Sequence, residues 1–219
     1  MNATIQLQKK AAVLAADGHP VGLLNRVVVD PADKALNAIV VRVGSLFRRE
    51  EKVVPIELIA ETSENQIVLN QNAGDIETFP PLEEEYIVDE REPVRDPPYA
   101  GSAGLSGVGH ADLGARAMRV APGHGVIPQI RQNIPDGTIV MDENPKIITL
   151  EGIHVGNVER ILADPTDEHM TGLVVSNGLF VKEMKLIPIQ WVTEMGMEHI
   201  HLCVKKASVE ELADLTQAG

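Results

Sequence analysis

Short apolar runs separated by turn residues dominate the chain, and two neighbouring runs have the pattern of a β-hairpin. The run from Leu23 to Asp30 is rich in Val and ends in Asp-Pro-Ala-Asp, and a second run extends from Leu36 to Val43. An Asp at the first position of a turn accepts a backbone hydrogen bond, and Pro at the second position presets φ for a type I turn. The pattern therefore predicts two antiparallel strands joined at this turn.

The same hairpin pattern occurs a second time, at Val158–Asp164 and Met170–Ser176, with Asp-Pro-Thr-Asp opening the turn. Residues 18–61 align with residues 152–194 when one residue is inserted beside Ser45. The identical pairs are Gly18/Gly152, Val21/Val155, Gly22/Gly156, Arg26/Arg160, Asp30/Asp164, Pro31/Pro165, Asp33/Asp167, Val40/Val174, Val41/Val175, Gly44/Gly178, Leu46/Leu179, Phe47/Phe180, Glu50/Glu183, Lys52/Lys185, Pro55/Pro188, Ile56/Ile189 and Glu61/Glu194. Shared composition does not produce identities in register, so the chain is interpreted as two copies of one module.

Further short strands are expected around each hairpin. They are Ala11–Ala15, Val53–Ile56 and Gln66–Asn70 in the first copy, and Lys146–Leu150, Leu186–Ile189 and His199–Val204 in the second. The runs that contain Pro55 and Pro188 are expected at a sheet edge or a bend, because Pro donates no ladder hydrogen bond. Five or six short strands without crossover helices predict an all-β fold with two small, closed or partly closed barrels.

A helical signal follows the last strand of the second copy. Ser208 is expected to cap this helix, with Glu211 completing a capping box. Val209, Leu212, Ala213 and Leu215 would form its apolar face. The corresponding segment of the first copy is cut short by Pro80 and Pro81.

Composition changes sharply between the copies, where acidic residues, Pro and Gly accumulate. Such a segment buries too little apolar surface to offset its conformational entropy, so it is predicted to be a mostly irregular linker. The predicted organisation is a first domain over residues 1–80, a linker over 81–127, and a second domain with a C-terminal helix over 128–219.

Charge and composition exclude several classes of protein. The chain has 19 basic and 32 acidic residues, a net charge of −13, which argues against direct binding of nucleic acid. One Cys cannot form an internal disulfide framework, and no run is apolar enough for a membrane helix or a signal peptide. A cytoplasmic location is therefore expected, with any membrane association made through a partner.

The order of motifs resembles the PRC-barrel family, named for the cytoplasmic domain of the photosynthetic reaction-centre H subunit. The motifs are Gly-x-x-Val-Gly, a strand, Asp-Pro-x-Asp, a second strand, Gly-Leu-Phe (after Gly44 one extra residue, Ser45, intervenes) and Pro-Ile. The resemblance covers roughly residues 5–79 and 134–215, and it extends to the C-terminal half of ribosome-maturation factors of the RimM type. An H subunit would carry an N-terminal membrane helix and a RimM-type factor a different first barrel, so a tandem PRC-barrel protein is the better description.

Candidate chemistry along the chain is sparse. The pairs Asp30/Asp33 and Asp164/Asp167 offer too few oxygens for a hard cation and are interpreted as turn caps. His199, His201 and Cys203 should share one face of a strand, where they would need further ligands to bind Zn²⁺ or Cu²⁺. Ile200, Leu202 and Val204 should face the core.

Three further features receive structural interpretations. The Gly-rich run 101–109 lacks the ending of a phosphate loop. Arg48, Arg49 and Lys52, together with Lys9 and Lys10, are interpreted as solvated turns, with contact to an acidic partner as the alternative. Trp191, Phe47 and Phe180 are expected to fill the barrel cores or the space between the barrels.

No catalytic set is recognisable, so the sequence predicts a non-enzymatic protein that needs no cofactor or metal. The resemblance implies an adaptor or assembly subunit that docks through its two barrels onto a larger protein complex, photosynthetic or otherwise membrane-associated, or onto further copies of itself. The alternatives are a ribosome-associated maturation factor acting through protein contacts and a regulator that binds a metal or small ligand at His199, His201 and Cys203.

Overall fold

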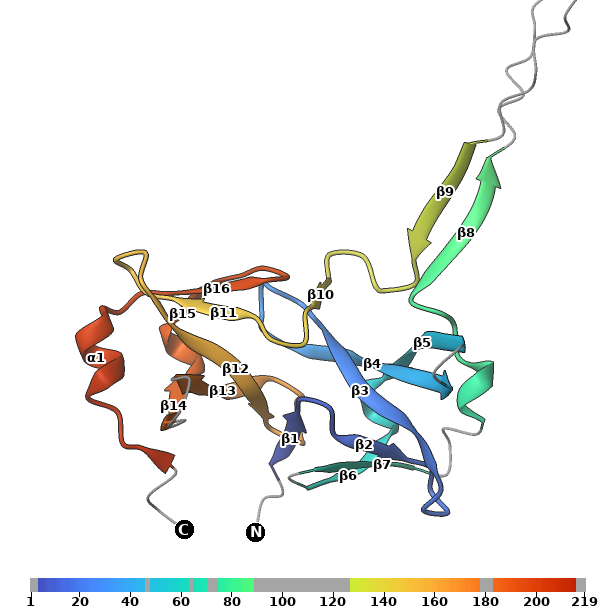
Figure 1. Ribbon diagram of the computed structural model, residues 1–219, viewed down its shortest axis with the longest axis horizontal. Coiled ribbons are helices and arrows are strands. Elements are labelled where there is room, and N and C mark those ends of the chain that lie inside the picture. The colour runs from blue at the N-terminus through green and yellow to red at the C-terminus, as the bar shows by residue number, and fades with distance from the viewer. Residues whose placement is uncertain are drawn as a thin grey trace, which may run out of the picture. The chain divides into compact units, whose positions relative to one another are not determined.

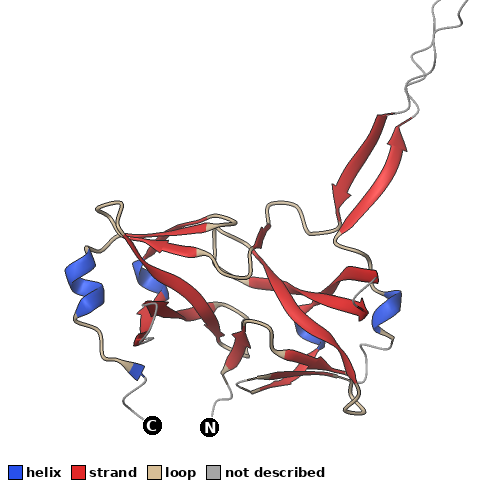
Figure 2. Ribbon diagram, in the orientation of Figure 1, coloured by secondary structure: helices blue, strands red, loops and turns tan. Residues whose placement is uncertain are grey.

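The computed structural model describes residues 4–45, 48–63, 65–70, 75–88, 127–177 and 183–215, and strands dominate these residues (Figure 2). The all-β prediction is confirmed. The chain forms two compact units, one containing residues 1–84 and 132–219 and the other residues 85–131. We call residues 4–84 the first half and residues 132–215 the second half of the larger unit.

The first half contains one sheet with the strand order β5-β4-β3-β2-β7-β6 (Figure 1). Its strands are β2 (Ala12–Leu14), β3 (Pro20–Val29), β4 (Leu36–Ser45), β5 (Arg48–Pro55), β6 (Ile59–Thr62) and β7 (Gln66–Leu69). The 3₁₀ helices η1 (Ile56–Leu58) and η3 (Ile76–Thr78) follow β5 and β7. The strand β5, which ends at Pro55, lies at the edge of the sheet, as expected for a strand that contains proline.

The second half has the same strand order, β14-β13-β12-β11-β16-β15. Its strands are β11 (Lys146–Ile148), β12 (His154–Ala163), β13 (Met170–Asn177), β14 (Glu183–Pro188), β15 (Val192–Met195) and β16 (His199–Leu202), with η4 (Ile189–Trp191) between β14 and β15. Both predicted hairpins, β3–β4 and β12–β13, are confirmed. Among the described residues, no strand pair closes either sheet into a barrel.

The two halves exchange one strand each, a feature that the sequence patterns did not predict. The strand β1 (Ile5–Gln8) precedes the first half but pairs antiparallel with β12 of the second half, from Ile5↔Ala163 to Gln8↔Arg160. The strand β10 (Ile139–Met141) precedes the second half and pairs with β3 of the first half. In Figure 1 the two exchanged strands lie against the partner half's long strand. Each of the long strands β3 and β12 therefore has an additional pairing partner that comes from the other half.

The tips of the two hairpins also pair with each other. Leu36 N donates to Glu168 O and Met170 N donates to Lys34 O, both at 3.0 Å. Lys34 and Glu168 have positive φ values of 66° and 61°, which is unusual for residues other than glycine. These hydrogen bonds relate equivalent positions of the two copies, so the contact has an approximate two-fold symmetry.

One hydrophobic core runs through both halves. It includes Leu7 of β1, Val13 and Ile67 of the first half, and Ile147 and Leu173 of the second. A smaller cluster on the outer face of β3–β4–β5 contains Val28, Ala38, Val40, Val53, Leu82 and Val140. Since Val140 comes from the exchanged strand β10, both clusters join the halves.

Two local predictions need correction. The helix α1 (Lys206–Glu210) begins earlier than expected, so Ser208 lies inside it, and the N-cap residue Lys205 makes no side-chain cap. Glu151 Oε2 accepts the hydrogen bond of Lys206 N at 3.0 Å instead, from a turn distant in sequence. Val209 is buried and Leu212 half-buried, whereas Ala213 and Leu215 are exposed.

The segment between the copies contains more regular structure than its composition predicts. The strand β8 (Glu83–Val88) pairs with β9 (Ile127–Gln132) in a separate two-stranded sheet. Residues 89–126 lie outside the described residues. No helix in the described ranges has the length and apolar character needed to cross a membrane.

Candidate functional site

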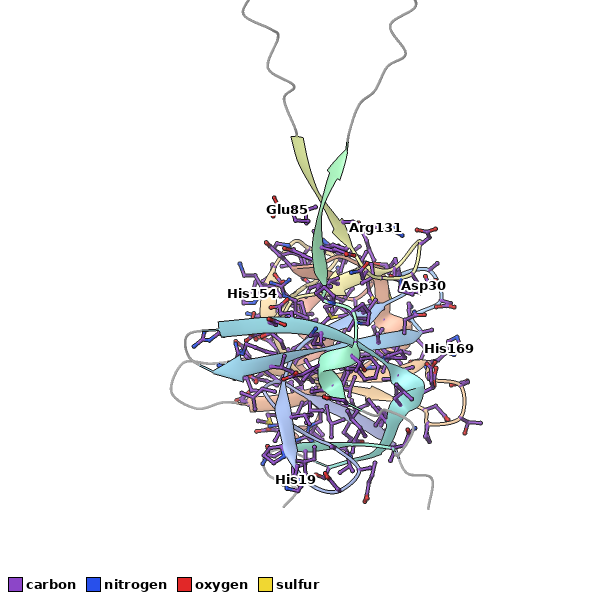
Figure 3. The ribbon with its side chains drawn as sticks, turned by 90° about the vertical axis from the view of Figure 1, so that its right-hand side faces the viewer. His19, Asp30, Glu85, Arg131, His154 and His169 are labelled. Carbon is purple, nitrogen blue, oxygen red and sulfur yellow. The ribbon has the colours of Figure 1, made fainter. Side chains whose placement is uncertain are left out.

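The four turn aspartates cap the backbone, as predicted. Asp30 Oδ1 accepts from Ala32 N at 2.8 Å and Asp33 Oδ1 from Ala35 N at 2.9 Å. Asp164 and Asp167 accept from Thr166 N and His169 N in the same way. Figure 3 labels Asp30 and His169, one on each hairpin tip. The turns therefore hold the tips in the conformation that lets the two halves pair.

The strand β16 has the predicted alternation. His199, His201 and Cys203 are exposed, whereas Ile200 and Leu202 are buried in the core. Glu194 of β15 lies opposite His201 and belongs to the same shallow surface depression as both histidines. Within the described part of the chain, no group of three His, Cys, Asp or Glu side chains is arranged to hold a metal ion.

The matched arginines Arg26 and Arg160 both contact the segment exchanged from the other half. Arg160 donates to Gln6 Oε1 at 2.9 Å and to Gln8 Oε1 at 3.0 Å on β1. Arg26 Nε lies 3.7 Å from Asp142 Oδ1, just after β10. Because Gln8 and Asp142 are equivalent positions of the two copies, the polar contacts repeat the two-fold symmetry of the strand exchange.

Between these arginines lies a cavity of about 30 Å³ that residues of both halves line. Asn25, which is 7% exposed, donates its Nδ2 to Glu51 Oε1 at 2.6 Å, and no described residue donates a hydrogen bond to its Oδ1. A cavity of this size holds a water molecule and is far too small for an organic ligand. This cavity is therefore a feature of the packing between the halves.

Lys52 has a structural role, which corrects its interpretation as part of a solvated turn. It is only 8% exposed, and its Nζ donates to Glu77 O of η3 at 3.2 Å. Its counterpart Lys185 donates to Val209 O at 3.2 Å and Glu210 O at 2.5 Å in α1. Each lysine satisfies carbonyls at the end of the helix that follows its sheet. The identity of these two positions in the sequence repeat was the available signal.

An open groove of about 490 Å³ lies over the ends of β3, β4 and β5 in the first half. Its lining residues are Pro20, Val21, Gly22, Leu23, Arg42, Gly44 and Arg49. Strand pairing places Leu23 opposite Arg42 and Gly44 opposite Arg49. We call this surface the arginine groove. Of the predicted basic residues whose side chains the structure describes, Arg49 lines it, and Arg42 was not singled out from the sequence.

The second half exposes apolar side chains where the first half has polar or small ones. Leu150 and Ile153, on the β11–β12 turn, are 65% and 41% exposed. The equivalent residues in the first half are Ala16 and His19. Isolated exposed apolar residues are common, but two on one turn form a compact candidate contact surface.

Other predicted features are only partly described. The side chain of Trp191 is half-buried and packs against the core. Phe47, Phe180 and the Gly-rich run 101–109 lie outside the described residues.

Lys34 and Glu168 occupy equivalent positions but have opposite charges. Lys34 Nζ donates to Val192 O at 2.7 Å and Ile189 O at 3.3 Å at the end of η4. The pKa of Glu168 is raised above its ordinary value, first by burial and then by the charge of Glu57 in η1. Lys34 of the first half therefore stabilises the end of η4 in the second half with a positive charge. Glu168 of the second half instead lies near the carboxylate of Glu57 in the first half.

Replacing Glu168 with Gln is expected to stabilise the protein at pH 7 but not at pH 4. A raised folded-state pKa means that Glu168 favours the folded state below its ordinary pKa and loses that contribution as the pH rises through the folded value. The gain at pH 7 should be small, about 0.5 kcal/mol or less, because solvent screens the group. Denaturant unfolding at both pH values measures it, and a loss of stability at pH 7 would contradict the assignment.

No family model and no curated protein matches this chain.

Proposed function

We propose that this chain is a non-enzymatic adaptor or assembly subunit. Its two halves act as PRC-type barrels that dock onto a larger protein complex in the cytoplasm, and any contact with a membrane is made through that complex. The motif order of the two copies and the shared strand order of the two sheets support this proposal.

The observation that carries the proposal is that the two halves share a framework but differ on their surfaces. Positions that the backbone needs are identical, as at Gly22 and Gly156, whose added Cβ atoms would both meet backbone oxygen at 2.6 Å or less. Exposed positions have diverged, as at Ala16/Leu150 and His19/Ile153. A repeat that keeps its fold but differs at exposed positions presents a different contact surface on each half.

The exchanged strands favour docking for a second reason. A partner that contacts both halves does not need to restrict their relative motion, because β1 and β10 already join them by backbone pairing. Preorganisation of this kind lowers the entropic cost of association.

The adaptor function is tested by affinity capture from the native lysate with the full chain as bait. The matched variant carries Leu150→Ala and Ile153→His, which are the residues of the first half at these positions. We expect one defined partner in constant ratio to the bait, with recovery reduced about tenfold by the variant. Met197→Glu, another substitution taken from the first half, is the control. Recovery of the bait alone, or a partner that both variants retain equally, would contradict the proposal.

A further inference from the structure

The arginine groove is the surface that the adaptor function described so far does not use. Leu23 is 38% exposed along its rim, and Pro20 is also exposed. Gly22 and Gly44 contribute no side chains, which leaves the hollow over the sheet open. The groove therefore combines an apolar wall with two guanidinium groups.

Arg42 and Arg49 project from the same face of the sheet. Arg49 is paired with Gly44 and Arg42 with Glu51, so the two arginines are diagonal neighbours on adjacent strands. Arg49 is exposed, and no described residue forms an ion pair with it. Arg42 lies 3.8 Å from Glu143, a distance too long for a strong charge-assisted hydrogen bond. Arg49 can therefore pair with a further anion, and Arg42 can donate to one with guanidinium N–H groups that do not face Glu143.

No carboxylate is among the described residues that line the groove, although two acidic residues lie on the neighbouring strand β5. Glu51 lies opposite Arg42 in the strand pairing, but its carboxylate accepts from Asn25 at 2.6 Å and lies 3.8 Å from Arg26. Glu50 lies on the opposite face of β5 and 3.7 Å from Lys52. On a chain with net charge −13, the described lining of the groove carries two arginines and no acidic side chain, and nearby charges dominate at physiological ionic strength.

The second half shows that the fold does not require Pro20, Leu23 or Arg42. Asn157 and Ser176 replace Leu23 and Arg42 at the equivalent positions, and His154 replaces Pro20. The backbone framework is retained despite these changes, since β12 and β13 pair as β3 and β4 do. Pro20, Leu23 and Arg42 are therefore specific to the first half. The other lining residues are shared, since Val21, Gly22 and Gly44 are identical in both copies and Lys182 matches Arg49.

We infer that the arginine groove binds an acidic, extended polypeptide segment of a partner protein. Carboxylate side chains would pair with Arg42 and Arg49, and an apolar side chain of the segment would contact Leu23 and Pro20. This inference deepens the proposed adaptor function by naming the chemistry of one partner, and it rests on that function.

Fluorescence anisotropy with a labelled peptide of repeated Asp-Glu-Leu tests the inference. The variant is Arg42→Ser with Arg49→Ser, in which the first change copies Ser176, and Arg131→Ser with Glu85→Ser serves as an exposed control outside the groove. We expect the full chain to bind the peptide, the groove variant to bind at least about fivefold more weakly, and the control to bind like the unmodified chain. Raising the salt concentration should weaken binding and reduce the difference.

A repeated Asn-Gln-Leu peptide and a single-stranded DNA of equal length distinguish the other occupants. Equal binding of the uncharged peptide, tighter binding of the DNA, no binding of the acidic peptide, or equal affinity of the groove variant would each overturn the inference. If lysate capture returns a partner that the groove variant retains, the groove inference fails while the adaptor function stands. If the peptide binds but no partner is captured, the adaptor function fails and the groove remains a binding site.

Discussion

Replacing Gly22 or Gly156 with Ala is expected to destabilise the protein by about 2–3 kcal/mol. At Gly22 the new Cβ would lie 2.6 Å from Arg42 O and 2.7 Å from Val41 Cγ1. At Gly156 it would lie 2.5 Å from Ser176 O, and the residue also has φ of +147°. Backbone cannot give way as a flexible side chain can, so the strands of the hairpin must separate locally.

Gly18→Ala is the graded control for these two substitutions. Gly18 has φ of +86°, but no atom lies within 4 Å of its added Cβ. We expect a destabilisation of about 1 kcal/mol, which comes only from placing alanine at a positive φ. Urea unfolding measures the loss of unfolding free energy in each of the three variants. If Gly18→Ala were as destabilising as Gly22→Ala, the close packing proposed for the first hairpin would be contradicted.

Leu7→Ala is expected to lower the free energy of unfolding by about 2–5 kcal/mol, although Leu7 lies near the N-terminus. The side chain is 2% exposed in the shared core, and its backbone pairs with Ile161 of the second half. Truncation removes apolar contacts that the neighbouring strands, held by their own ladders, cannot readily replace. As a control, Leu215→Ala, at an exposed position, should change the free energy of unfolding by no more than about 0.5 kcal/mol.

The single tryptophan makes the Leu7 experiment informative about the strand exchange. Trp191 lies in η4 of the second half, whereas Leu7 precedes the first half. If the exchanged strand couples the halves, Trp191 fluorescence and far-ultraviolet circular dichroism should report the same shifted transition in Leu7→Ala. An unchanged fluorescence transition beside a shifted dichroism transition would show that the halves unfold independently.

Local sequence signals predicted the hairpins and the edge strands because their causes are local. Asp30 and Asp164 bond to the backbone within their own turns, so a short sequence window contains the whole interaction. The alternation at His199–Leu202 likewise reports which side chains face the core. Pro55 and Pro188 end strands at the sheet edges because a proline donates no ladder hydrogen bond, a property of the single residue.

The strand exchange was not predictable by the same reasoning, because its partners are distant in sequence. The strand β1 is four residues long, and nothing in these residues tells whether they pair with β3 or with β12. The N-terminal cap of α1 was not predictable for the same reason, since the side chain that accepts from Lys206 N belongs to Glu151, in a turn distant in sequence. Lys52 appeared solvated as part of a charged run, and only its match to Lys185 pointed to a shared structural role.

Cleavage of the connection between the halves tests the interlocked arrangement most directly. A specific protease site placed between residues 89 and 126 of the full chain would separate β1–β8 from β9–α1 covalently. Native size-exclusion chromatography with light scattering should then show both fragments co-eluting at the mass of the intact chain. Two fragments that elute separately, each still rich in β-structure, would show that each half is complete alone and that the reciprocal pairing does not hold the molecule together.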